Sequence, residues 1–297
     1  MGDQKVGLLW PYLQFQILMN KLIVNSNAKV NIGLKILKKR KDGYHNIRTI
    51  FQEIDLTDII SIEKNKTRFK FTTNVTWLGE NNLCVIAYKL MKKEFQINEV
   101  SIDLTKNIPR GSGLGGGSSN AASIMKGIRK LYNLNITDNE LEELASTIGA
   151  DVPFFIKGSV QLGEGIGNKL TPIIFNDKFK YLIVIPDIVI DTPWAYSQYK
   201  NDLDSSISSV NFAGLSKEEI VSIDRLKFFE NDFESIVVPT YPEIGEIKKM
   251  LIQLGAEYAS LSGSGSTVYG IFNDNVCLNN ALSYFSPKHK TFIANPL

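Results

Sequence analysis

Apolar and polar residues repeat with two different periods along the chain, and the shorter period predicts strands. Alternation of apolar and polar residues is typical of a half-buried strand, whereas a short continuous apolar run is typical of a fully buried one. On this basis we predict strands at residues 22–37 (in two runs on either side of Lys29), 49–63, 67–71, 100–104, 181–186 and in the run that ends at Phe272. The basic stretch 38–41, followed by Asp42 and Gly43, predicts a hairpin turn.

The longer period, with apolar residues three or four positions apart, predicts helices. Such helices are expected at residues 82–95, from about Ser118 to Leu131, at 138–148 and at 242–254. Ser118 or Ser119 could cap the second of them, because hydroxyl side chains satisfy free N–H groups at a helix start. Thr137 and Glu140 form a capping box for the third helix, and Gly149 closes it.

These elements mix without strict alternation of strand and helix, which is typical of an α+β fold. The apolar strand at 181–186 is expected to open a second domain, and the polar residues 200–216 are expected to form a loop. We therefore predict an α+β protein of two domains.

Composition and charge narrow the class of protein. The chain has 297 residues, 43% of them hydrophobic, which is enough for real cores in one large or two ordinary domains. A formal net charge of +2 argues against a dedicated nucleic-acid surface. The two cysteines lie far apart, as expected of thiols in a reducing cytosol, so we predict a cytoplasmic protein.

No apolar stretch approaches the roughly 18 residues that a membrane span needs. Residues 1–18 are fairly apolar but lack the small-residue cleavage site of a signal peptide. We interpret them as an extension, or the product of a misplaced start, that adds nothing to the fold.

The most informative stretch is rich in glycine. Five of the seven residues from Gly111 to Gly117 are glycine, which costs chain entropy and contributes no packing. The run leads directly into the helix that bears Ile124 and Ile128. A bare backbone that feeds a helix N-terminus presents free N–H groups to an anion, so this loop is predicted to bind phosphate.

Two known phosphate-binding segments, the P-loop and the dinucleotide fingerprint, are also rich in glycine, as is a flexible linker. A P-loop requires a lysine directly after the glycines, but Gly117 is followed by Ser118. The dinucleotide fingerprint matches the glycines literally but lacks an acidic residue at a strand end about 20 positions later, since Asp138 lies at a helix start. A flexible linker would not be flanked by a strand and a strongly amphipathic helix.

Instead, three motifs resemble those of the GHMP kinases, named for galactokinase, homoserine kinase, mevalonate kinase and phosphomevalonate kinase. The phosphate loop matches from Pro109 to Ala122. The first motif matches at 27–32, with the sequence Asn-Ala-Lys-Val-Asn-Ile, and the third at 261–269, which contains Gly263 and Gly265. The motifs occur in the family's order and spacing, and the resemblance covers nearly all of residues 20–297.

The resemblance implies a fold and a substrate. The GHMP kinase fold joins an N-terminal domain like ribosomal protein S5 domain 2, expected here at residues 19–172, to a ferredoxin-like domain at 173–297. The segments 42–47 and 149–155 resemble a family member of the non-mevalonate (MEP) isoprenoid pathway. The implied substrates are ATP and a cytidine-diphospho sugar alcohol.

Roles for individual residues follow from the same resemblance. Asp151 would be the general base for the acceptor hydroxyl, and Lys29 would keep it charged and stabilise the developing alkoxide. The implied ATP-binding residues are Asn82, Lys106, Pro109, Gly111, Gly113, Leu114, Gly115, Gly116, Gly117, Ser118 and Ser119. The implied substrate-binding residues are Asn31, Tyr44, His45, Asp151, Thr192, Tyr196, Gly263 and Gly265. Tyr44 and Tyr196 would stack on cytosine, with His45 bonding its edge.

Several GHMP kinases hold magnesium with a glutamate in the helix after the loop, but positions 120–130 of this chain contain no carboxylate. We therefore expect no dedicated metal site and expect Mg²⁺ to arrive with ATP. Two alternatives remain open: another GHMP small-molecule kinase of homoserine or mevalonate type, or a non-catalytic nucleotide-binding protein of the same fold. A monomer or weak homodimer is expected.

Overall fold

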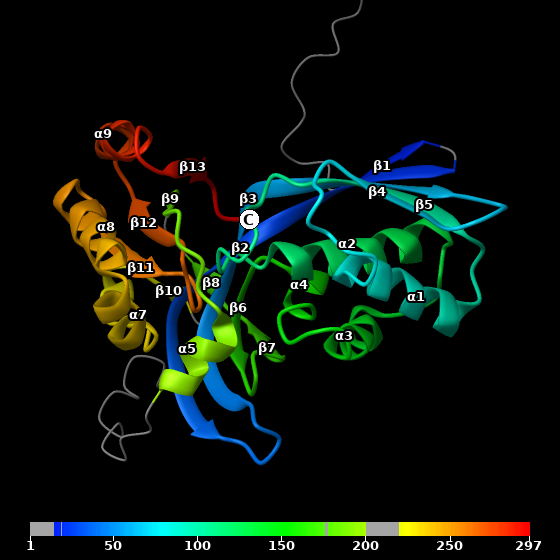
Figure 1. The fold of residues 1–297 in the computed structure, drawn as a ribbon, viewed down its shortest axis with the longest axis horizontal. Helices are drawn as coiled ribbons and strands as arrows, with labels where there is room; N and C mark the ends of the chain where they lie inside the picture. The colour runs from blue at the N-terminus through cyan, green and yellow to red at the C-terminus, as the bar shows by residue number, and fades with distance from the viewer. Residues whose placement is uncertain (1–14, 19, 176–177, 200–219) are drawn as a thin grey trace, which may run out of the picture.

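The computed structural model describes residues 15–18, 20–175, 178–199 and 220–297, which form two sheets with helices on their outer sides (Figure 1). The first sheet contains β1 (Phe15–Leu18), β2 (Lys21–Lys39), β3 (His45–Lys64), β4 (Lys70–Thr73), β5 (Val100–Thr105), β6 (Val160–Glu164) and β7 (Lys169–Pro172). Its strand order is β1-β2-β3-β5-β4, and β6 pairs with both β3 and β7. Only the β4–β5 pairing is parallel among these strands.

The second sheet is antiparallel and has the order β11-β12-β9-β13. It contains β9 (Lys180–Ile185), β11 (Tyr258–Leu261), β12 (Val268–Phe272) and β13 (Lys290–Ala294). The short strands β8 (Ile174–Phe175) and β10 (Ile220–Val221) pair in parallel with each other.

The helices divide between the two sheets. The first sheet carries α1 (Leu83–Phe95), α2 (Gly116–Leu131), α3 (Asp138–Ser146) and α4 (Phe154–Lys157). The second part contains α5 (Thr192–Gln198), α6 (Ile223–Leu226), α7 (Glu234–Thr240), α8 (Pro242–Gln253) and α9 (Asn275–Phe285). No helix among the described residues is long and apolar enough to cross a membrane.

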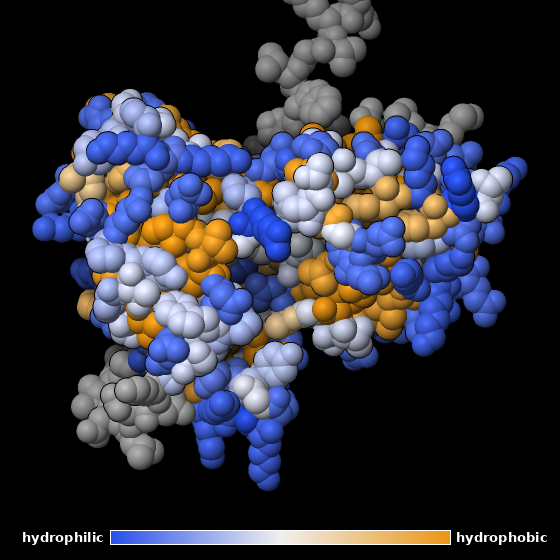
Figure 2. All heavy atoms as spheres, in the orientation of Figure 1, coloured by the Kyte–Doolittle hydropathy of each residue, from blue (hydrophilic) through white to orange (hydrophobic). Residues whose placement is uncertain are grey.

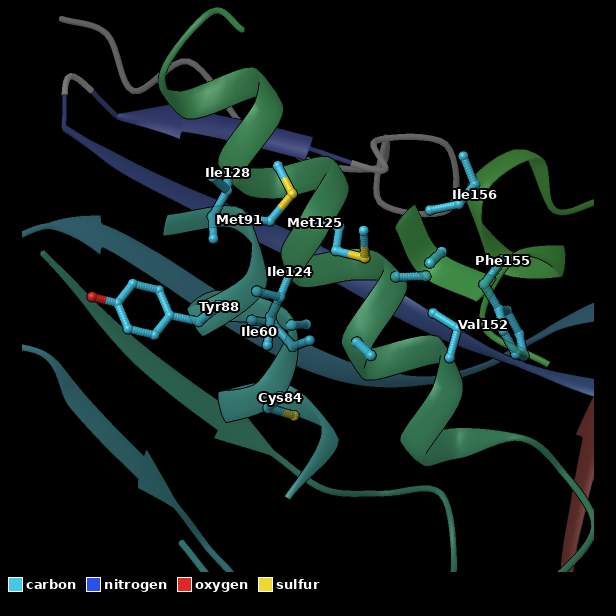
Figure 3. Packing of buried hydrophobic residues seen from close by; sticks show 14 of the residues in the cluster. Ile60, Cys84, Tyr88, Met91, Ile124, Met125, Ile128, Val152, Phe155 and Ile156 are labelled. Carbon is cyan, nitrogen blue, oxygen red and sulfur yellow. The ribbon is translucent and has the colours of Figure 1, made fainter. Parts of the chain in front are cut away.

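Three apolar clusters hold these layers together. The first packs β2 and β3 against β9 and β12, with Val30 and Tyr269 both fully buried, and so joins the two sheets. The second lies between the first sheet and helices α1 and α2, where Ile60, Met91 and Ile124 meet (Figure 3). The third packs the second sheet against α7, α8 and α9. Figure 2 shows the surface hollowed between the two lobes that these clusters build.

The predicted elements are largely confirmed, including the hairpin turn after Lys39 and the capping box formed by Thr137 and Glu140. Residues 22–37 form part of one strand rather than two, because bulges between Asn27 and Ala28 and between Ile32 and Leu34 absorb the irregularities. The predicted loop at 200–216 lies outside the described residues.

Two predictions about chain ends and helix ends were wrong. Residues 15–18 belong to the first sheet as β1, which pairs with β2, so the extension expected at 1–18 is not wholly outside the fold. Helix α2 begins at Gly116, and the residue before it, Gly115, has φ 69° and no side-chain cap. The serines predicted to cap this helix lie inside its first turn. The domain boundary near Pro172, at the end of β7, stays a prediction.

Candidate active site

The glycine-rich loop has a backbone that few other residues could adopt. Gly111, Gly113 and Gly115 all have positive φ, of 63°, 77° and 69°. A Cβ atom on Gly113 would lie 2.1 Å from the carbonyl oxygen of Ser262, so this glycine also permits close contact with the turn after β11. The loop leads with this backbone directly into the N-terminus of α2, the end of a helix that attracts anions.

A cavity of about 560 Å³ opens over this loop. Every residue that the sequence analysis assigned to ATP lines it except Ser119. Ser119 is buried, and its hydroxyl pairs with that of Ser26 at 2.8 Å. Asn82 also serves as the N-cap of α1, since its side-chain oxygen accepts from Cys84 N and Val85 N.

A second cavity of about 560 Å³ lies on the other side of the loop. All of the residues assigned to the second substrate line this cavity except Gly265. Lys29 lines it as well. A Cβ on Gly265 would instead press on Ile190 and Leu261, so this glycine serves packing. Gly113 and Gly115 line both cavities, so the loop separates two binding spaces that meet at its backbone.

Lys29 and Asp151 form an ion pair where the cavities meet. The Lys29 Nζ lies 3.3 Å from Asp151 Oδ2, with side-chain exposures of 5% and 33% respectively. The backbone N–H of Lys29 donates to the Leu114 carbonyl at 3.0 Å, which ties β2 to the glycine loop. Gly115 is needed here too, since a Cβ would lie 3.0 Å from the Lys29 side chain. A carboxylate beside a buried ammonium and a phosphate-type loop suits proton and phosphoryl transfer.

Asn31 links this pair to the rest of the site. Its Oδ1 accepts from Lys29 Nζ at 2.6 Å, and its Nδ2 donates to the Thr49 hydroxyl at 3.1 Å. Both of the polar atoms of its side chain are thereby engaged, and the residue is 2% exposed. Asn31 thus holds the Lys29 ammonium in position.

The aromatic residues of the second cavity are arranged differently from the expected sandwich. The rings of His45 and Tyr196 stack on each other, with centroids 5.3 Å apart and planes at 9°. Tyr44 is 61% exposed and lies at the edge of the same cavity. Burial, followed by the positive charge of Lys39, lowers the pKa of His45 from its ordinary value, so the imidazole is neutral at pH 7.

The third motif and α5 complete this cavity. The hydroxyls of Thr192 and Ser264 pair at 2.7 Å, which joins the start of α5 to the glycine-serine turn. Ser262 Oγ donates to the Gly113 carbonyl at 2.9 Å, which joins that turn to the phosphate loop. Residues far apart in the sequence thus meet around one loop.

Comparisons with known proteins identify the family of this chain. A model of the GHMP kinases N terminal domain matches residues 82–159, and a model of the GHMP kinases C terminal matches residues 213–286. The chain is 42% identical over 260 residues to the 4-diphosphocytidyl-2-C-methyl-D-erythritol kinase of Bacteroides fragilis, covering 85% of this chain and 92% of the relative. The enzyme of the same name from Caldanaerobacter subterraneus is 41% identical over 259 residues, covering 86% of this chain and 89% of the relative.

The chain belongs to the 4-diphosphocytidyl-2-C-methyl-D-erythritol kinase family. A crystal structure of 4-(cytidine 5'-diphospho)-2C-methyl-D-erythritol kinase superposes with a TM-score of 0.75 at 26% identity, over 92% of this chain and 98% of the other. A homoserine kinase from Cytophaga hutchinsonii has a TM-score of 0.74 at 17% identity, over 95% and 96%, which shows the shared fold alone. The predicted GHMP kinase fold, of α+β class, and the predicted small-molecule kinase activity with ATP are confirmed.

Sequence reasoning missed several residues that line or support these two cavities. Trp77 and Arg110 line the cavity over the loop, where the Arg110 guanidinium lies 5.3 Å from the centre of the Trp77 ring. Phe51 lies under the Lys29 ammonium at 5.5 Å. Asp58 is fully buried behind the phosphate loop and accepts four hydrogen bonds. Arg110 stands in the glycine-rich loop but is not one of its glycines, and Trp77, Phe51 and Asp58 stand outside every glycine-rich motif, so only their tertiary positions identify them.

Proposed function

We propose that this chain transfers the γ-phosphoryl group of ATP to the 2-hydroxyl group of 4-diphosphocytidyl-2-C-methyl-D-erythritol, in the non-mevalonate pathway to isoprenoid precursors. Membership of the kinase family supports the reaction. The observation that carries the assignment of residues is the Lys29–Asp151 ion pair, because it lies beside Gly115, a residue common to both cavities. One cavity would hold ATP and the other would hold the acceptor.

In this proposal Asp151 accepts the proton of the acceptor hydroxyl as its oxygen attacks the γ-phosphorus. The bond from the γ-phosphorus to the β,γ-bridging oxygen breaks, and ADP leaves with the electron pair. Lys29 neutralises the charge that develops on the attacking oxygen. The N–H groups at the start of α2 stabilise the charge on the phosphates.

The acceptor cavity would recognise the cytidine part of the substrate. Tyr44 is exposed at its edge, and the stacked His45–Tyr196 pair forms one wall, so aromatic faces are present for a base. A neutral His45 has one N–H donor and one acceptor nitrogen, which suits the edge of a pyrimidine. Asn31, Thr192 and Gly263 would contact the rest of the substrate.

Magnesium would enter bound to ATP. The hydroxyl of Ser118, at the first turn of α2, lines the ATP cavity and has the oxygen donor that Mg²⁺ prefers. The hydroxyl of Ser119 is already paired with Ser26, so it is the poorer candidate. We further propose a cytoplasmic enzyme that is a monomer or a weak homodimer.

The test is a coupled assay of ADP release with purified protein and three acceptors. We expect turnover with 4-diphosphocytidyl-2-C-methyl-D-erythritol and none above background with homoserine or mevalonate. Product analysis by ³¹P NMR would locate the new phosphate on the 2-hydroxyl oxygen. Preferential turnover of homoserine or mevalonate would contradict the proposal, and ATP binding without transfer to any acceptor would favour a non-catalytic protein.

A further inference from the structure

A buried carboxylate lies directly behind the phosphate loop and is used by none of the steps above. Asp58, on β3, is 0% exposed, and its two oxygens accept from four donors. Oδ1 accepts from the backbone N–H groups of Asn107 at 2.6 Å and Ile108 at 2.8 Å. Oδ2 accepts from the Lys106 ammonium and from Asn120 Nδ2, the latter at 2.8 Å. A buried charge needs such partners, and this one is fully engaged.

The four donors come from both sides of the phosphate loop in the sequence. Lys106, Asn107 and Ile108 stand immediately before the phosphate loop, at the end of β5. Asn120 stands just after the loop, in the first turns of α2. A single carboxylate therefore holds both ends of the loop Pro109–Gly115: the residues that lead into it, and the helix α2 that follows it. Fixing both ends lowers the entropy that the loop would otherwise lose when it closes on a ligand.

Asp58 also orients the cation nearest to the loop. The Lys106 ammonium has three N–H donors, of which Asp58 takes one and Asn120 Oδ1 takes another at 3.1 Å. Among the described residues the third donor has no partner, and Lys106 lines the ATP cavity. The ammonium lies close to the start of α2, since a Cβ on Gly116 would be 3.1 Å from it. Its charge is thus held beside the N–H groups of that helix.

We infer that Asp58 is a positioning residue for ATP: it fixes both ends of the phosphate loop and presents the remaining donor of Lys106 to the nucleotide. The inference rests on the proposed assignment of this cavity to ATP. It predicts that changes at Asp58 weaken ATP binding and leave binding of the cytidine substrate unaffected, because its partners Lys106 and Asn120 line the first cavity and not the second.

The experiment measures the dissociation constant of MgATP by calorimetry, with no acceptor present. In Asp58→Asn an amide N–H₂ replaces one oxygen, and in either orientation it faces two donors. We expect MgATP to bind about tenfold or more weakly, as for the loss of a hydrogen bond to a charged group. Lys106→Gln keeps a donor for Asp58 but removes the charge, and a similar loss is expected. The double variant should lose less affinity than the sum of the two single losses, because both changes disrupt the contact between Asp58 and Lys106.

The control is Glu99→Gln, which lies in the same sheet-and-helix unit but lines neither cavity. Glu99 likewise accepts from a lysine and a second donor, Lys92 and the hydroxyl of Tyr88. Its variant should lower the melting temperature and bind MgATP as the wild type does. If Asp58→Asn does not fold, Asn120→Ala replaces it, since this change cuts the link to α2 and keeps both charges.

The outcomes distinguish failure of the ATP assignment from failure of the role of Asp58. If the wild type does not bind MgATP, the proposed assignment of the cavity fails. If the wild type binds MgATP but Asp58→Asn (or Asn120→Ala) binds it equally well, the inference fails and Asp58 is structural only. Equal weakening of MgATP and of the cytidine substrate would also overturn it, as would additive losses from Asp58 and Lys106.

Discussion

Replacing Asp151 by Asn is the sharpest test of the proposed chemistry. The side chain keeps its shape and can still accept a hydrogen bond from the Lys29 ammonium, 3.3 Å away, but it loses the capacity to take a proton. Loss of a general base costs about 10²–10⁴ in rate, which is about 3–5 kcal/mol of barrier. We expect kcat to fall by this factor. The affinity for ATP should be unchanged, because Asp151 lines only the acceptor cavity.

A double-variant cycle with Lys29→Met tests whether the two residues act as one unit. Unit charges 3.3 Å apart attract by about 5 kcal/mol at an effective dielectric of about 20, a value that water reduces here because Asp151 is 33% exposed. Strong coupling predicts that the double variant is about as slow as the slower single one. Single-turnover rates of ADP formation provide the measurement. A kcat of Asp151→Asn within tenfold of the wild type, or strictly multiplicative losses, would refute the reasoning.

Three further changes probe the loop and the acceptor cavity. In Gly113→Ala the new Cβ would lie 2.1 Å from the Ser262 carbonyl oxygen, so this variant should lose activity and have a lower melting temperature. Gly111→Ala has φ 63° but open space around it, so it should cost only the backbone strain of about 1–3 kcal/mol. Equal melting temperatures of the two variants would contradict this. Tyr44→Ala should raise KM for the cytidine substrate and spare KM for ATP in steady-state kinetics, and the reverse pattern would mean that the two sites are exchanged. The folded-state pKa of His45 is lowered by burial, so its neutral form stabilises the fold above the unfolded-state value of about 6.5, and that contribution is lost as the pH falls below it. In thermal melts His45→Gln should therefore lose less stability than the wild type between about pH 7 and pH 5, and an identical pH dependence would argue against a buried neutral imidazole.

Elements with a strong local signal were predictable from the sequence. The capping box at Thr137 and Glu140 needs only residues within one turn, and the structure confirms it. The residues 181–186 form a continuous apolar run, which is typical of a strand buried on both faces. The structure has this strand as β9, Lys180–Ile185. Local propensity and tertiary packing favour the same structure at these positions.

Predictions failed where a distant contact outweighs a local preference. Ser119 is a good capping residue by type, but its hydroxyl pairs with Ser26, which lies 93 positions earlier in the chain. The left-handed backbone of Gly115 starts α2 without a side-chain cap. In the acceptor cavity His45 stacks on Tyr196, and this contact depends on how the β2–β3 hairpin meets α5, which no local pattern encodes.

The sequence by itself determined the class of fold, the family resemblance and most of the residues around the two cavities, because a loop with a left-handed backbone at positions 111, 113 and 115 must carry glycine there, which makes it visible in the sequence. Only the tertiary structure decided how these residues meet. The Lys29–Asp151 pair joins β2 to a turn more than a hundred residues away. Asp58 becomes recognisable only when β3 brings its carboxylate to both ends of the loop. A buried charge must be satisfied by whatever donors the fold supplies, and those donors lie far away in the sequence.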